Sequence, residues 1–258
     1  MKIIALLFIS LSTPALADYT IQYNGLTNAR GIDDAGNIVG NLQGYNSSSA
    51  LSPDGTITPI PCGSFPTSIV DGVLVGYSYD LMTAVTKGFI YKDGICTDGG
   101  GILTDYNNGK ATGYSANSPQ SAFYGSTIIA YPGARHNRAE GVNRLNIVAG
   151  YSQIPTRPLL GARSPLKTIG WLWSAEAGFF KTFPGYQIAD VNDLGEILSA
   201  APQAVFDVNG VATKLPIAMN TWGTWLYEMN NSGEIAGTVR ISGTQYTYSG
   251  VVYKKSAP

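Results

Sequence analysis

Basic side chains gather in the middle of the chain, in the segment Arg135-His136-Asn137-Arg138. More follow in a segment that we interpret as an insertion, at Arg157, Arg163 and Lys167. Guanidinium and ammonium groups bind carboxylates and phosphates, so these residues are candidates for holding an anionic ligand. The alternative is a solvated charged loop, because arginine is ordinary on protein surfaces.

Two tryptophans mark a second candidate, the segment Met219-Asn220-Thr221-Trp222-Gly223-Thr224-Trp225. An exposed Trp222 would stack on a sugar ring or on an apolar partner. The alternative is burial between structural units, and for Trp225 we expect that outcome because aromatic side chains supply much of a core.

Nucleophilic catalysis has little support in the sequence. His136 is the only histidine, and no Gly-x-Ser-x-Gly motif occurs that would place a serine nucleophile beside it. We expect His136 to be structural or to face solvent. Glycoside cleavage needs two carboxyl groups, and no spacing singles out such a pair. The sequence calls for no cofactor.

Metal binding is not predicted either. Two cysteines and one histidine are too few for a four-ligand structural zinc site. The Asp- and Asn-rich turns, such as Asp33-Asp34-Ala35-Gly36-Asn37, lack the alternating acidic ligands and final Glu of a calcium loop. We interpret them as Asx turns, in which the side chains hydrogen-bond to the local backbone.

The N-terminal segment has the features of a secretory signal peptide over residues 1–17. Lys2 precedes an apolar run, and the segment ends Ala15-Leu16-Ala17 before Asp18. An uncut anchor is the alternative. An exported chain permits a disulfide between Cys62 and Cys96, and two separate buried thiols are the other possibility. We expect residues 18–258 to be a secreted domain, periplasmic or extracellular.

A repeated motif is the main architectural signal, and its first copy is Gly31-Ile32-Asp33-Asp34-Ala35-Gly36-Asn37-Ile38-Val39-Gly40. Its apolar anchors are separated by 37, 37, 36, 49 and 38 residues. Such a period indicates a propeller, a solenoid or another repeat array. The six anchors are Ile32, Ile69, Tyr106, Val142, Val191 and Met229.

Each period predicts four short strands separated by tight turns. Asp-Gly and Asn-Gly pairs between apolar runs are hairpin signals, as at Asp54-Gly55 and Asn209-Gly210. The 31 glycines disfavour the long helices of a helical solenoid. Six repeats of four antiparallel strands predict an all-β, six-bladed β-propeller as a single domain. Because the last repeat ends after three strands, we expect Tyr19–Tyr23 to supply its fourth and to close the ring.

Residues 29–40, Ala-Arg-Gly-Ile-Asp-Asp-Ala-Gly-Asn-Ile-Val-Gly, resemble the repeat of the bacterial extracellular HAF-repeat proteins. Residues 139–150 and 227–237 match that pattern loosely, whereas the copies at 68 and 190 depart from it. The resemblance implies an extracellular β-propeller and supplies no catalytic motif.

The balance of 16 basic and 17 acidic residues gives no overall field to attract nucleic acid or to bind an anionic membrane, and no membrane insertion is expected. Long connections fall on one face of the predicted propeller and tight turns on the other, and loops on a rigid scaffold often bind ligands. We therefore predict a monomeric binding module that recognises carbohydrate or a surface protein through its variable-loop face. A glycan hydrolase with acidic residues near the central channel is one alternative, and a purely structural secreted protein is another.

Overall fold

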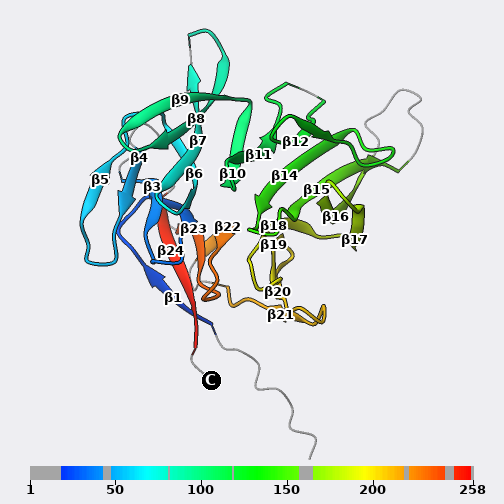
Figure 1. The fold of residues 1–258 in the computed structure, drawn as a ribbon. Helices are drawn as coiled ribbons and strands as arrows, with labels where there is room; N and C mark the ends of the chain where they lie inside the picture. The colour runs from blue at the N-terminus through cyan, green and yellow to red at the C-terminus, as the bar shows by residue number, and fades with distance from the viewer. Residues whose placement is uncertain are drawn as a thin grey trace, which may run out of the picture.

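The computed structural model describes residues 19–42, 48–80, 82–117, 119–156, 165–217, 221–241 and 247–256. These residues form six four-stranded antiparallel sheets, which stand as blades in a propeller (Figure 1). The predicted six-bladed β-propeller is therefore confirmed. The signal-peptide interpretation concerns residues 1–17, which lie outside the described part of the chain.

The blades are numbered in chain order, and each is given from its inner strand outward. Blades 1 and 2 contain β2 (Asn28–Ile32), β3 (Ile38–Asn41), β4 (Ser48–Leu51) and β5 (Ile57–Pro59), then β6 (Phe65–Val70), β7 (Val73–Asp80), β8 (Val85–Lys92) and β9 (Ile95–Gly100). Blades 3 and 4 contain β10 (Ile102–Asn107), β11 (Lys110–Tyr114), β12 (Ala122–Tyr124) and β13 (Thr127–Ile129), then β14 (His136–Val142), β15 (Val148–Pro155), β16 (Leu166–Ser174) and β17 (Gly178–Pro184). Blades 5 and 6 contain β18 (Gln187–Val191), β19 (Ile197–Ala201), β20 (Gln203–Phe206) and β21 (Ala212–Lys214), then β22 (Thr221–Met229), β23 (Ile235–Ile241), β24 (Thr247–Lys255) and β1 (Tyr19–Tyr23).

The ring is closed by the first strand of the chain. β1 pairs antiparallel with β24, with Tyr19 opposite Lys255 and Tyr23 opposite Val251. Figure 1 shows the dark blue β1 beside the red β24. This is the closure that the three-stranded last repeat predicts, and it covers the edge of β24 that would otherwise lack a backbone partner.

Every inner strand carries a β-bulge at the same repeat position. In β2, Ala29 pairs with Gly40 and Gly31 pairs with Val39, so Arg30 is left without a partner. A bulge of this kind re-aims the extra side chain and is common beside functional sites. The six extra residues are Arg30, Thr67, Thr104, Glu140, Ala189 and Tyr227.

The repeated glycine of the second strand makes room for this bulged strand. A Cβ atom on Gly40 would overlap the backbone carbonyl oxygen of Asn28, and one on Gly113 would overlap that of Ile102. The glycine that ends the sequence motif is thus required by close backbone approach, not by a turn.

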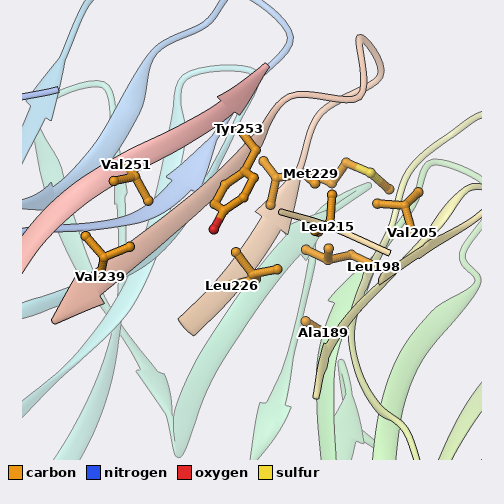
Figure 2. Close-up of a cluster of buried hydrophobic side chains, with 10 residues drawn as sticks. Ala189, Leu198, Val205, Leu215, Leu226, Met229, Val239, Val251 and Tyr253 are labelled. Atoms are coloured by element: carbon orange, nitrogen blue, oxygen red, sulfur yellow. The ribbon is translucent and has the colours of Figure 1, made fainter. Parts of the chain in front are cut away.

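The hydrophobic core lies between neighbouring blades. Figure 2 shows one such cluster, which joins blade 5 to blade 6. Leu198 and Val205 from blade 5 meet Leu226 and Tyr253 from blade 6, and all four are buried. Ile21 of β1 packs against the same cluster, so ring closure and core formation are coupled.

The insertion in the fourth repeat is partly strand. The 49-residue spacing of the fourth repeat predicts an insertion at residues 151–169, and β15 and β16 extend into it as far as the pair Pro155 and Leu166. The long strand pair satisfies backbone hydrogen bonds that a loop would leave to solvent. Residues 157–164 lie outside the described part of the chain.

A disulfide joins Cys62 and Cys96. It ties the link between blades 1 and 2 to β9, the outermost strand of blade 2. Within the described ranges, no helix has the length and apolar character needed to cross a membrane.

Candidate binding site at the mouth of the central channel

The axis of the propeller is hollowed at both ends, and three buried carboxyl groups lie between the hollows. The cavity among the tight turns, here the turn-side cavity, measures about 400 Å³. The cavity at the opposite end, here the loop-side cavity, measures about 380 Å³. Asp105, Asp190 and Glu228 line both. We call these three residues the carboxyl belt.

The carboxyl belt holds neighbouring blades together. Asp105 of blade 3 accepts a 2.7 Å hydrogen bond from the backbone N–H of Val142 in blade 4. Asp190 accepts one of 2.7 Å from Met229 in blade 6. Glu228 accepts one of 2.7 Å from Ile32 in blade 1. Much of the hydrogen-bonding capacity of the belt is therefore used within the protein.

Burial raises the pKa of every belt carboxyl group. The pKa of Asp105 is raised to about 6, mainly by burial. The pKa values of Asp190 and Glu228 are raised well above the usual range, by burial first and by the neighbouring belt carboxyl groups second. The belt therefore holds protons near neutral pH more readily than exposed carboxyl groups do.

The turn-side cavity is lined by polar groups that satisfy one another. Asn143 accepts hydrogen bonds from the backbone of Leu145 and Ile147, as the Asx-turn interpretation predicts. Arg144 extends toward the turns of other blades, with its Nη2 3.1 Å from Asp71 and its Nε 3.6 Å from Asp193. Because its charged groups already have partners, this end is the weaker candidate for a ligand site.

The loop-side cavity has aromatic and charged walls. All six bulge residues line it, and the second strands of blades 2, 3 and 4 each add a tyrosine. Trp225 stands in its wall with 41% of its surface exposed. The expectation that Trp225 packs between blades is therefore wrong. Its position in the first half of β22, ahead of the bulge, places it at the channel mouth. The aromatic lining consists of Tyr77, Tyr114, Tyr151, Trp225 and Tyr227.

Arg138 is the best-anchored cation of this cavity. Its Nη1 donates a 2.7 Å hydrogen bond to the Tyr151 hydroxyl, and its Nη2 contacts the Tyr114 hydroxyl. Its guanidinium carbon lies 4.0 Å from the centroid of the Tyr114 ring. Its Nε lies 3.3 Å from Glu140 Oε1, an ion pair without hydrogen-bond geometry.

Burial also affects the titration of two of these neighbours. It raises the pKa of Glu140 despite the opposing effects of Arg138 and Arg30. It raises the pKa of the Tyr151 phenol, which therefore keeps its proton at neutral pH. Because that hydroxyl accepts from Arg138, its own proton is available for a ligand.

The predicted basic cluster is only partly brought to this cavity. Arg138 lines it, whereas the exposed Arg135 and Lys167 do not. His136 is half-buried and accepts a 3.4 Å hydrogen bond from the backbone N–H of Gln120, outside the lining. Arg157 and Arg163 lie outside the described residues, as does the side chain of Trp222.

Several lining residues were missed because our interpretation looked for ligand contacts in loops. Tyr77, Tyr114 and Tyr151 each follow the repeat glycine, so Gly-Tyr-Ser occurs at one position in three consecutive copies. Arg30 and Glu140 stand two residues before their anchors. A tyrosine that recurs at one repeat position was the sequence signal that could have identified part of this lining.

No group of three or more His, Cys, Asp or Glu residues in the described ranges is arranged to hold a metal ion. A scan against protein-family models found no matching family, and a comparison with curated proteins found no match.

Two solved structures match this chain over most of its length. A streptogramin B lyase structure has a TM-score of 0.51 and 11% sequence identity, over 95% of this chain and 100% of that chain. A selenomethionine-substituted virginiamycin B lyase from Staphylococcus aureus has a TM-score of 0.44 and 11% identity, over 90% of this chain and 88% of that chain. At such identity, similarity shows the fold alone.

Proposed function

We propose that the protein is an exported carbohydrate-binding module that holds a sugar residue in the loop-side cavity. The observation that carries this proposal is the aromatic lining, which surrounds a cavity of about 380 Å³ with five rings. Aromatic rings pack against the apolar faces of sugars while hydroxyl and charged groups fix the orientation. A concave site of this size suits a small ligand better than a flat protein surface.

Rigidity supports the same proposal. The lining residues stand on strands, and the Cys62–Cys96 disulfide suits an oxidising destination outside the cytoplasm. A preformed site costs little ordering entropy on binding. Export and membership of the HAF-repeat proteins are parts of this proposal, and they rest on residues 1–17 and on the repeat motif. A monomeric state is proposed with them.

Hydrolysis of glycans is less well supported. Such cleavage uses two carboxyl groups, one on each side of the scissile bond. In the loop-side cavity the belt carboxyl groups accept backbone hydrogen bonds, as Asp105, Asp190 and Glu228 do from Val142, Met229 and Ile32. Glu140 is the remaining carboxyl group among the described lining residues, and it forms an ion pair with Arg138. The geometry of the loop-side cavity therefore favours sugar binding over sugar hydrolysis.

A glycan array followed by calorimetric titration tests the proposed function. We expect Trp225→Ala to weaken saccharide binding about tenfold, because a central aromatic anchor contributes roughly 1–2 kcal/mol. The control is Phe180→Ala, which removes an exposed ring of β17 that does not line the cavity. Binding to envelope proteins with no saccharide retained, or equal affinity of Trp225→Ala and wild type, would contradict the proposal.

A further inference from the structure

Arg30 is a cation of the loop-side cavity that forms no ion pair with any residue the structure describes. It is the bulge residue of β2, and its guanidinium carbon lies 4.8 Å from the centroid of the Tyr227 ring. Its Nε is shielded from solvent and has no hydrogen-bond partner among the described residues. Stacking on a ring uses only the face of the guanidinium, so the in-plane N–H donors of its two Nη atoms stay available to a ligand.

The other charges of the cavity are already engaged. Arg138 is held by Tyr114, Tyr151 and Glu140, so Glu140 balances Arg138. Blade 4, which carries Glu140, stands opposite blade 1, which carries Arg30, in the ring of six. Arg30 therefore faces the ion pair across the channel. Its charge still acts on Glu140, whose pKa it lowers, but within the described ranges the direct partner of Glu140 is Arg138.

The carboxyl belt does not supply the missing anion. Its oxygens accept hydrogen bonds from the backbone N–H groups of Ile32, Val142 and Met229, and burial favours its protonated forms. A cationic ligand would find an arginine on each side of the cavity. An anionic ligand would find one arginine with no ion-pair partner among the described residues, together with the tyrosines of the lining.

We propose that the sugar bound in the loop-side cavity is an acidic one, whose carboxylate is bound by Arg30. The planar guanidinium matches the two oxygens of a carboxylate, which gives this pairing its geometry. The Tyr151 hydroxyl and the aromatic lining then contact the rest of the sugar. This inference rests on the proposed carbohydrate-binding function and names the class of sugar.

The test compares two oligosaccharides of equal length by isothermal titration calorimetry, a galacturonate oligomer and the neutral galactose oligomer. We expect wild-type protein to bind the acidic oligomer at least about tenfold more tightly at low ionic strength, and the preference to shrink with added salt. Arg30→Gln should reduce the preference to about twofold, because the acidic oligomer loses more affinity than the neutral one. Arg135→Gln, the same substitution at an exposed arginine outside the cavity, should leave the preference intact.

Two further arms keep the proposal falsifiable. Arg30→Lys keeps the charge without the planar fork, so it should retain part of the preference, and it replaces Arg30→Gln if that variant fails to fold. A sulfated neutral oligomer should bind more weakly than the galacturonate. Equal binding of acidic and neutral oligomers, or an unchanged preference in both Arg30 variants, would overturn this inference and leave the carbohydrate-binding function standing. If neither oligomer nor any other saccharide binds, the proposed function fails as well.

Discussion

The contacts of Ser68 bear on the protonation of the carboxyl belt. Its Oγ lies 2.6 Å from Asp105 Oδ1 and 2.5 Å from Glu228 Oε1. A serine hydroxyl has one proton to donate, so the second short contact requires a proton from a carboxyl group. Geometry and burial therefore agree that Asp105 and Glu228 share at least one proton in the folded state.

The belt should make the protein more stable in mild acid. The folded pKa of Asp105 is about 6, and its ordinary value is 3.8. Between these values the folded state binds more protons than the unfolded state, so the free energy of unfolding falls as pH rises through this window. We expect a loss of about 1–3 kcal/mol between pH 4 and pH 7 from Asp105 alone.

Urea unfolding at intervals across that pH range measures the effect. Asp105→Asn is the matched variant, because an amide keeps an acceptor oxygen and donates to Ser68 without titrating. Its unfolding free energy should change less with pH than that of wild type. A wild-type stability that rises from pH 4 to pH 7 would show that the belt is ionised in the folded protein.

At the scale of the strand, the repeat glycine and the bulge depend on each other. Blade 5 has Ser199 where blades 1 to 4 have glycine, and there the pairing changes. Gln187 pairs with Ala201 and Ile188 pairs with Ser199, so Ala200 becomes an extra residue on the second strand. The additional irregularity accommodates the side chain that the other blades exclude.

Gly113→Ala should therefore be costly. The new Cβ would overlap the Ile102 carbonyl oxygen, and the bulge that aims Thr104 into the cavity would have to move. We expect a loss of about 1–3 kcal/mol, as for other overpacked sites. Thermal and urea unfolding measure it. Ser199→Gly is the control and should change stability by no more than about 1 kcal/mol, because it removes one 3.3 Å hydrogen bond to Gln187. Equal losses in the two variants would refute this account.

The repeat pattern predicted the strands well and the site poorly, for a physical reason. Strand Tyr19–Tyr23 has the bounds that the sequence predicts, because an alternating apolar run is a local signal. The bulge at Arg30 is a register relation between two strands, so no single segment reveals it. In the sequence, each carboxyl-belt residue is only an acidic residue directly before an apolar anchor of the repeat. Its burial results from closure of the ring, which no local pattern reveals.

At the scale of the whole molecule, closure depends on five residues at the start of the described chain. β1 gives blade 6 its outer strand, and Ile21 inserts into the cluster shared by blades 5 and 6. Every blade contacts two others. Glu228 of blade 6 accepts a hydrogen bond from Ile32 of blade 1, so displacement of β1 would also disturb the central channel.

Ile21→Ala should therefore weaken the entire ring. We expect a loss of about 1–2 kcal/mol, below the 2–5 kcal/mol typical of fully buried isoleucines because Ile21 is half-buried. Thr20→Ala, on the exposed face of the same strand, should change stability by less than about 0.5 kcal/mol. Chemical denaturation gives the two values, and native-state hydrogen exchange should show β24 amides losing protection only in Ile21→Ala. Indistinguishable variants, with β24 equally protected in both, would mean that β1 does not close the propeller.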